Sequence, residues 1–388
     1  MAGTTHAPRR RATDLNAHVV FAGGGTAGHL FPGLAVAKHL ARGQCPPRIT
    51  FAGSGKAFER RYVEAGGFAY VPLPCRATPR TPWAAMRFCL DHVRGQFAAR
   101  RFIRRHGVAL VVGLGGYASV PMARAAVARG VPLVLLEQNA VPGKTTRWLA
   151  PRARLVCAAF EEARQQMPSA AELKITGNPV AEEFAAVAEL RRRRTSQERP
   201  LLTVLGGSQG SHSLNQYVPK ALARLGNLVR GQWRIVHQAG EDQVAATQQS
   251  YARLDLPAQV VPFVHDMPGL LATTDLVISR AGGTTLAELA VAGLPAVLVP
   301  YPHAADDHQM ANARVYSEAG GCRVVDCVPG ENGLDTKLAD ALEDLMTDAA
   351  VRASMGAAME RMSRPKAAGD VVSLLEGLLR PASAASHE

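Results

Sequence analysis

The fold is decided by one stretch of sequence, HVVFAGGGTAGHLFPGLAVAKHLARG, which runs from His18 to Gly43. In it a short apolar strand leads into a glycine-rich turn and then into a helix-length segment. The same succession returns at Leu201, in LLTVLGGSQGSHSLNQYVPKALARLG. A strand, a glycine-rich turn and a helix form the opening unit of a Rossmann-like domain. The repeat therefore predicts two such domains, the second starting near residue 200.

Strand-like and helix-length segments alternate along the rest of the chain. Apolar runs such as RITFAG, ALVVGLGG and DLVISRAGG are separated by helix-length segments. This alternation predicts an α/β fold with parallel sheets and helices on both faces. Pro365 breaks the last helix of the second domain. We expect a basic tail over 1–16, an N-terminal domain over 17–178, a C-terminal domain over 179–364, and a helix over 366–380 that packs back on the first domain.

The composition excludes several classes of protein. Of 388 residues, 47% are hydrophobic and 20% are charged, which is typical of folded proteins and not of disordered ones. No run of 18 apolar residues is present, so we expect no membrane-spanning helix. The N-terminus lacks the apolar stretch of a secretory signal, so we expect a cytoplasmic protein.

The net charge of +12 suits an acidic partner. Nucleic acid, anionic lipid and a phosphorylated small molecule all meet that description. The arginine run over 188–200 is interpreted as a solvated surface segment. Aromatic residues make up only 5% of the chain, and its basic stretches lack the signatures of RNA-binding modules, so we expect no nucleic-acid partner.

The first glycine-rich turn satisfies the pattern GxGxxG through Gly23, Gly25 and Gly28. A dinucleotide-binding site also needs an acidic residue at the end of the second strand, about 20 residues on. Here that strand ends in AGSG, and the first carboxylate after it is Glu59. The dinucleotide interpretation thereby loses its support. A phosphate site and a tight turn without a ligand remain as alternatives.

Two further turns repeat the arrangement of a strand, two glycines and a small polar residue that enters a helix. They are LGGYASVP from Leu114 and LGGSQGS from Leu205. Glycines allow a close approach to phosphate, and helix N-termini supply free N–H groups and a favourable dipole. Three such turns predict a phosphate-holding cleft between the domains.

Two interpretations of Glu288 are open, a structural one and a ligand-binding one. Thr285 and Glu288 have the spacing of a capping box, which the spacing alone slightly favours. Glycines precede this segment, however, and a carboxylate one turn into a helix can accept both hydroxyl groups of a ribose. His308, Gln309 and Asn312 follow at the start of another predicted helix, where amides can recognise a sugar or a base.

Taken together, these residues resemble the MurG family of bacterial peptidoglycan N-acetylglucosaminyltransferases, which convert lipid I to lipid II. The motifs GGTAGHxxPGLA, GGY, EQN, GNPV, GGSQG, AGxxTxxE and DDHQ occur in the family's order from about Val19 to the final helix. The resemblance implies a GT-B fold and inverting transfer of GlcNAc from UDP-GlcNAc to the C4 hydroxyl of MurNAc. A UDP-GlcNAc 2-epimerase and a UDP-sugar glycosyltransferase with a soluble acceptor are the alternatives on the same fold.

The resemblance also assigns roles to individual residues. It makes His29 the first candidate for the general base, an imidazole whose ordinary pKa suits neutral pH, while simple phosphate binding by His29 stays open and Glu137 is the reserve base. The acceptor diphosphate would lie near Gly115, Gly116 and Tyr117. The residues implied for UDP-GlcNAc binding are Thr26, Ala27, Gly28, Asn139, Ser208, Val264, Gly283, Thr284, Thr285, Glu288 and Gln309.

Three positions depart from the family pattern. Ala27 stands where Gly is frequent, Leu136 where His is frequent, and Ala181 where an Arg usually follows GNPV. The expected contact of that guanidinium with the donor is therefore missing or comes from elsewhere. The sequence also contains no DxD motif, so we expect no cofactor and no metal, with helix N-termini stabilising the leaving diphosphate.

The segment over 76–105 is a candidate membrane contact. Apolar side chains recur from Trp83 at helical spacing, and arginines recur every seventh residue at Arg80, Arg87 and Arg94. Such a pair of stripes suits an anionic membrane surface, whereas the apolar stripe alone would equally suit a core. We expect a peripheral protein on the cytoplasmic face of the cell membrane. Its predicted partners are UDP-GlcNAc, lipid I and anionic lipid, and the resemblance adds proteins of the cell-wall and division machinery as candidates.

Overall fold

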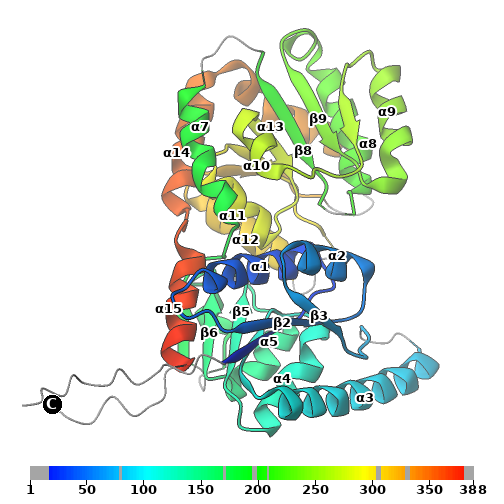
Figure 1. Ribbon diagram of the computed structural model, residues 1–388. Coiled ribbons are helices and arrows are strands. Elements are labelled where there is room, and N and C mark those ends of the chain that lie inside the picture. Colours follow the sequence, from blue (N-terminus) through cyan, green and yellow to red (C-terminus); the bar gives the residue numbers. More distant parts are fainter. Residues whose placement is uncertain are drawn as a thin grey trace, which may run out of the picture.

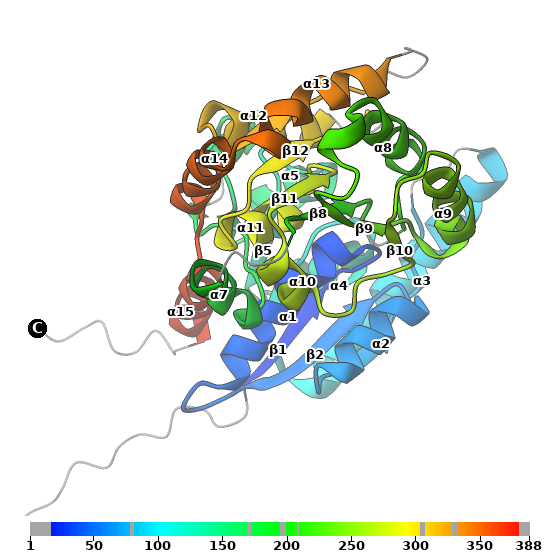
Figure 2. The ribbon, with the colours of Figure 1, turned by 90° about the horizontal axis from the view of Figure 1, so that it is seen from above.

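The chain forms two α/β domains, one above the other in Figure 1. This computed structural model describes residues 17–77, 81–168, 172–194, 199–207, 209–302, 307–327 and 333–379. The expected tail over 1–16 lies outside the described residues. Viewed from above, the sheet of the C-terminal domain lies over the N-terminal domain (Figure 2).

The N-terminal domain is built on a seven-stranded sheet with the order β3-β2-β1-β4-β5-β6-β7. All of its strand pairs are parallel. The strands are β1 (His18–Ala22), β2 (Arg48–Gly53), β3 (Ala69–Pro72), β4 (Val108–Gly113), β5 (Leu133–Glu137), β6 (Leu155–Ala158) and β7 (Glu172–Ile175). The helices are α1 (Ala27–Ala41), α2 (Ala57–Ala65), α3 (Pro82–His106), α4 (Val120–Ala128), α5 (Lys144–Leu149) and α6 (Ala163–Gln166).

Both faces of this sheet are buried, which explains the unbroken apolar runs of its central strands. Val19 and Phe21 of β1 belong to a core cluster that includes residues of α1. Val20 and Ala22 belong to another cluster, with residues of α3 and α4. Successive side chains of a strand point to opposite faces, so a strand covered on both faces has to be apolar throughout.

The C-terminal domain has a six-stranded parallel sheet with the order β10-β9-β8-β11-β12-β13. Its strands are β8 (Leu201–Leu205), β9 (Arg234–Gln238), β10 (Gln259–Val261), β11 (Leu276–Ser279), β12 (Ala296–Leu298) and β13 (Cys322–Val324). The helices from residue 187 onward are α7 (Val187–Arg193), α8 (His212–Arg224), α9 (Val244–Arg253), α10 (Met267–Thr273), α11 (Gly283–Val291), α12 (His308–Glu318), α13 (Leu334–Thr347), α14 (Ala349–Met362) and α15 (Ala367–Leu379).

The final helix, α15, leaves the C-terminal domain and packs on the first one (Figure 1). Its residues Val371, Val372 and Leu375 are buried in the same cluster as Val19 and Phe21 of β1. The chain therefore crosses between the domains twice, once before α7 and once between α14 and α15.

The arginine run at the start of the C-terminal domain is largely engaged by carboxylates and carbonyl groups. Arg192 pairs with Glu189 and Glu360, and Arg194 pairs with Asp275. Arg191 instead is half-buried and donates to the carbonyl groups of Ala292 and Gly293 at 2.9 and 2.7 Å. The run thus fastens α7 to its own domain.

The strand orders place the glycine-rich turns together. In the first sheet the order reverses between β1 and β4, and in the second it reverses between β8 and β11. Ligands of open α/β sheets bind at such switch points, beyond the carboxyl ends of the strands. The turns after β1, β4, β8 and β11 are the ones that the sequence analysis selected.

Candidate active site between the two domains

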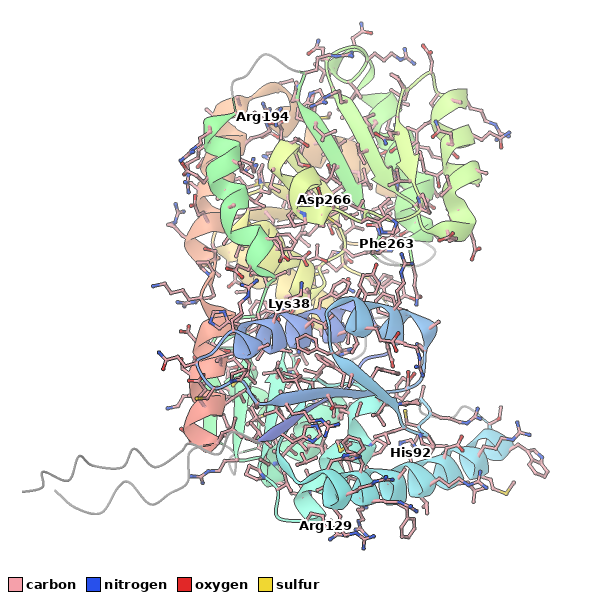
Figure 3. The ribbon with its side chains drawn as sticks, viewed as in Figure 1. Lys38, His92, Arg129, Arg194, Phe263 and Asp266 are labelled. Carbon is pink, nitrogen blue, oxygen red and sulfur yellow. The ribbon has the colours of Figure 1, made fainter. Side chains whose placement is uncertain are left out.

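One large cavity, of about 1510 Å³, lies between the domains and is lined by residues of both. It exceeds the 300–1,000 Å³ of a typical small-molecule site and can hold a nucleotide sugar with part of a second substrate. Lys38 of α1 and Phe263 of the C-terminal domain lie on opposite sides of the gap between the domains (Figure 3). The switch points of both sheets open into this space.

His29, on the first turn of α1, lines the cavity from the N-terminal domain. Its Nδ1 lies 3.0 Å from Oγ1 of Thr26, and its ring packs against the backbone of Gly115 and Gly116. When Nδ1 carries the proton and donates it to Thr26, Nε2 offers a lone pair, and within the described part of the chain Nε2 makes no hydrogen bond. Burial lowers the pKa of His29, which Glu137 partly offsets and His308 reinforces. The imidazole is therefore neutral at neutral pH and able to accept a proton.

Glu137, the reserve base, is occupied by the loop that follows β5. One oxygen accepts hydrogen bonds from the backbone and side-chain nitrogens of Asn139, both at 3.1 Å, and the other accepts one from the Gly143 N–H at 3.0 Å. This carboxylate shapes the loop over 139–143 and is 4% exposed. Of the two candidate bases, His29 therefore has a nitrogen without a hydrogen bond among the described residues, whereas both oxygens of Glu137 accept hydrogen bonds.

On the opposite wall, the N-terminus of α8 faces the cavity through Ser211, His212 and Ser213. Arg280, which follows β11, donates hydrogen bonds to Oγ of Ser211 at 3.0 Å and to Oγ of Ser213 at 2.6 Å. Burial lowers the pKa of Arg280, but an arginine remains charged at any physiological pH. A helix N-terminus beside a guanidinium is a site for an anion such as a diphosphate.

Glu288 lies one turn into α11 and lines the cavity. The capping box is not formed, because Gly282 is the N-cap of α11 and no side chain caps this helix. Burial raises the pKa of Glu288 to about 8. Among the described residues Glu288 has no side-chain hydrogen bond, so its carboxyl group is free to receive hydroxyl donors such as those of a ribose.

Two of the residues predicted to bind the donor, Gly283 and Thr284, make contacts between the domains. A Cβ added to Gly283 would lie 2.0 Å from the carbonyl oxygen of Gln138, so only glycine allows this approach, and Gly283 does not line the cavity. Thr284 donates a hydrogen bond of 2.9 Å to the carbonyl oxygen of Gly28. That carbonyl has no helical partner because the residue four positions on is Pro32, which lacks an N–H group.

Asn139 is also held between the domains. Its Oδ1 accepts a hydrogen bond of 3.1 Å from Asn312, a fully buried residue of α12. Oδ1 of Asn312 in turn accepts one of 2.8 Å from the Ala140 N–H. The amide nitrogen of Asn139 donates to Glu137, so both polar atoms of its side chain make a hydrogen bond within the protein, and the residue also lines the cavity.

The structure brings most of the sequence-predicted residues to this one cavity. Tyr117 does not line it, because its ring lies by Gly25, and Ser208 lies outside the described residues. The predicted residues that line the cavity are Thr26, Ala27, Gly28, His29, Gly115, Gly116, Glu137, Asn139, Val264, Thr284, Thr285, Glu288 and Gln309.

Sequence reasoning missed Arg280. It stands directly before the Ala-Gly-Gly of a turn that was selected for its glycines and for the spacing of Thr285 and Glu288. A basic residue where a central strand meets a glycine-rich turn was the available signal, because that position is at the switch point. Ala181, where the family usually has Arg, also lines the cavity, as does Lys38, which forms an ion pair of 3.5 Å with Glu183.

The predicted membrane helix corresponds to α3, whose apolar stripe faces outward. Trp83 is 78% exposed and Phe97 is 66% exposed, and Met86, Leu90 and Val93 between them are also exposed. Arg87 and Arg94 are exposed on the same helix, whereas Arg80 lies outside the described residues. The stripe is therefore not part of the core. Of the helices described here, none is long and apolar enough to cross a membrane.

Two Rossmann-like domains that enclose a shared site at their switch points are the arrangement of the GT-B class, and this chain is a GT-B glycosyltransferase. The N-terminal domain of glycosyltransferase family 28 matches residues 19–157, and the C-terminal domain of that family matches residues 201–371. Within this class, the chain belongs to the MurG family.

A curated relative from Stutzerimonas stutzeri (strain A1501) is 39% identical over 362 residues, covering 93% of this chain and 98% of the relative. Its name is UDP-N-acetylglucosamine–N-acetylmuramyl-(pentapeptide) pyrophosphoryl-undecaprenol N-acetylglucosamine transferase. A crystal structure of Acinetobacter baumannii MurG superposes with a TM-score of 0.71 at 31% identity, covering 93% of this chain and 99% of that one. UDP-GlcNAc 2-epimerase from Neisseria meningitidis, bound to UDP-GlcNAc, has a TM-score of 0.66 at 11% identity, with 93% and 100% covered, and shares the fold alone.

Proposed function

We propose that this chain transfers GlcNAc from UDP-GlcNAc to the C4 hydroxyl of MurNAc in undecaprenyl-pyrophosphoryl-MurNAc-pentapeptide, converting lipid I to lipid II. Membership of the MurG family supports this donor and this acceptor, because the relatives carry the activity in their names. The observation that carries the proposal is the placement of His29 and the N-terminus of α8 on opposite walls of one cavity. A transfer reaction needs both a base and an anion site.

The donor is assigned to the C-terminal wall. Glu288 would receive the hydroxyl groups of the ribose, Val264 would contact uracil through its backbone, and the diphosphate would lie between α8 and Arg280. Gln309 would contact the sugar, although its Oε1 accepts a hydrogen bond from the Tyr301 N–H at 2.9 Å in the free protein. Its amide nitrogen is the atom left for a GlcNAc hydroxyl.

The reaction is a single displacement at C1 of GlcNAc. The MurNAc hydroxyl oxygen forms the new β-linked bond as the bond from C1 to the diphosphate oxygen breaks, and configuration inverts. Nε2 of His29 takes the hydroxyl proton, and UDP leaves with the bonding electron pair. Gly115 and Gly116, which contact the ring of His29, would lie beside the acceptor diphosphate.

We assign the stabilisation of the charge on the departing diphosphate to groups of the protein. The N-terminus of α8 carries a partial positive charge, and Arg280 adds a full one. Arg280 could also replace the arginine that the family usually has at position 181, where this chain has Ala181. It follows a different strand, β11, and its guanidinium bonds to Ser211 and Ser213 at the N-terminus of α8. The sequence has no DxD motif to hold a metal at the diphosphate, so we propose transfer without a metal cofactor.

Because the acceptor is a lipid, the protein has to bind a membrane, and α3 offers an exposed apolar and basic face for that contact. Exposed aromatic side chains enter the interface, and each flanking arginine contributes on the order of 1 kcal/mol with anionic headgroups. We propose that the protein is peripheral and sits on the cytoplasmic face of the cell membrane, where UDP-GlcNAc is available.

The proposal is tested by transfer of label from UDP-GlcNAc to a short-chain lipid I analogue, with and without EDTA. Equal product in both supports the acceptor and the metal-free mechanism. Product that disappears with EDTA keeps the acceptor but refutes the metal-free step. Release of UDP without transfer, or formation of UDP-ManNAc, overturns the acceptor and favours the epimerase or a glycosyltransferase with a soluble acceptor.

The membrane contact is tested by co-sedimentation with vesicles that contain anionic phosphatidylglycerol. Replacing Trp83 and Phe97 by Ser should lower the partition coefficient at least about tenfold, because burying one large apolar side chain stabilises by about 1.5–3 kcal/mol. The matched control is Leu190→Ser, which removes an exposed apolar residue of α7. Equal binding by the double variant and the control would refute the role of α3.

A further inference from the structure

Glu59 of α2 is a fully buried carboxylate that no step of the proposed reaction uses. It lies beneath the glycine-rich loop over 23–29. Oε1 accepts hydrogen bonds of 2.6 Å from the Gly25 N–H and from the Ser54 hydroxyl. Oε2 accepts one of 2.7 Å from the Ser54 N–H and one of 2.5 Å from the Tyr70 hydroxyl. Four donors thus converge on two oxygens.

The surrounding glycines leave room for this carboxylate. A Cβ added to Gly24 would lie 2.7 Å from Oε1 of Glu59, and one added to Gly53 would lie closer still to Oε2. Gly24, inside the loop that resembles a nucleotide-binding pattern, and Gly53, at the end of β2, therefore make space for a carboxylate of the protein's own. A Rossmann dinucleotide site uses its acidic residue on a ribose, whereas this one is turned inward.

The loop is fixed at Gly25, directly before the N-cap residue of α1. Glu59 holds the Gly25 N–H, and the Lys56 ammonium group donates a hydrogen bond of 3.0 Å to the Gly25 carbonyl. Thr26, the next residue, is the N-cap of α1, and its hydroxyl lies 3.0 Å from Nδ1 of His29. The position of the imidazole thus depends on the loop that Glu59 anchors.

Only a carboxylate meets the demands of this position. The two backbone partners are obligatory donors, and the Tyr70 hydroxyl already accepts a hydrogen bond of 2.7 Å from the Gly55 N–H. Burial and the bond to Glu59 raise the pKa of Tyr70, so its hydroxyl keeps the proton that it donates. An amide at position 59 would turn its NH₂ group toward one of these donors and leave that donor without an acceptor.

We propose that Glu59 is a positioning residue, which holds His29 in place for proton transfer by anchoring Gly25. This inference rests on the proposed function, in which His29 is the base. It makes the loop over 23–29 a support for the base and removes its central N–H from phosphate binding. The chemistry of the loop is then set by a residue 34 positions away in sequence.

The test is Glu59→Gln, with Glu64→Gln as the matched control on the exposed face of the same helix. For Glu59→Gln we expect kcat to fall about tenfold to a hundredfold, because a displacement of about 1 Å has that cost. KM for UDP-GlcNAc and the Kd of UDP should stay within about twofold, because the donor wall is unchanged. Hydrogen exchange should speed up at the amide of Gly25, and the control should match the wild type.

A second variant covers the case in which Glu59→Gln does not fold. Tyr70→Phe removes one donor and no charge, and should lower kcat about twofold to fivefold with UDP binding unchanged. Faster exchange at Gly25 with unchanged kcat would overturn the inference, since Glu59 would then be only structural. A loss of UDP affinity equal to the loss of kcat would also overturn it. The transfer assay with the wild-type enzyme tests the proposed function separately. If the wild type does not glycosylate lipid I, both the proposed function and this inference are overturned.

Discussion

The two central glycine-rich loops, over 23–29 and 206–211, share one local pattern and meet opposite charges. The first is anchored from inside by the carboxylate of Glu59, and the second is bonded to the guanidinium of Arg280. At the strand end that corresponds to Arg280, the N-terminal domain has Leu114, which is fully buried. Glycines therefore indicate a close approach of the backbone. We propose that the charged residue beside them determines whether the loop binds a carboxylate of the protein or a phosphate.

The sharpest test of this division is His29→Ala, which acts on the first loop only. We expect kcat to fall about 10²–10⁴-fold, because a general base is lost, with little change in UDP binding. In the wild type, kcat should fall in acid as the imidazole becomes protonated, at a pH below the ordinary pKa of about 6.5, because burial lowers the pKa of His29. The variant should lose that limb of the pH profile.

His39→Ala is the control for this measurement, because His39 is exposed on the last turn of the same helix. Steady-state kinetics and calorimetric titration with UDP read out the two effects. If UDP affinity fell by the same factor as kcat in His29→Ala, the two loops would not have separate roles.

Arg280→Ala probes the second loop and should act on the donor. A hydrogen bond to a charged group contributes about 1.5–3 kcal/mol, so the Kd of UDP should rise about 10- to 150-fold. Arg280→Lys should recover part of the affinity, because the charge stays and the paired geometry is lost. Arg224→Ala, at the other end of α8, is the control, since Arg224 is exposed and pairs with Asp335. Unchanged UDP affinity in Arg280→Ala would place the diphosphate elsewhere.

Glu288→Gln gives the smallest effect and the clearest pH dependence. The pKa of Glu288 is raised from 4.5 to about 8, so the folded protein holds this proton more tightly than the unfolded chain. The free energy of unfolding therefore declines as pH rises from 4.5 to about 8. Above pH 8 the folded protein bears the full cost of burying an ionised carboxylate. The variant lacks this titration, so its melting temperature relative to wild type should climb between these pH values.

Above pH 8, where the wild-type Glu288 is a charged acceptor for the ribose, the same variant should bind UDP about fivefold to tenfold more weakly. Scanning fluorimetry across pH and calorimetry with UDP measure both effects. Glu318→Gln, exposed on α12, is the control. A melting-temperature difference that does not vary with pH would contradict the burial of an ionisable Glu288.

Much of the fold follows from local pattern. Strands such as β1 and β8 are short, apolar and closed by glycine, and parallel α/β topology brings the ends of central strands to one switch point in each sheet. The turns before His29 and Glu288 were selected because each follows such a strand end and leads into a helix. Their selection needed only short-range sequence, whereas the role of His29 as a base came from the resemblance to a family.

The rest depended on contacts between distant residues. Glu59 reaches Gly25 across 34 residues, and Thr284 reaches Gly28 across 256. Nothing local distinguishes Gly283, whose neighbour is a carbonyl of the other domain, from a glycine that contacts a ligand. The stripe on α3 posed a similar problem, because spacing shows that a helix has an apolar face but not what covers that face.

The position of α3 affects how the two proposed substrates reach the enzyme. It lies at the end of the molecule away from the C-terminal domain (Figure 1). In the proposed attachment through α3, the C-terminal domain, to which we assign the nucleotide, would lie on the side away from the bilayer. In that arrangement the water-soluble substrate would arrive by diffusion in three dimensions and the lipid-linked one by diffusion in two, each from its own side of the molecule.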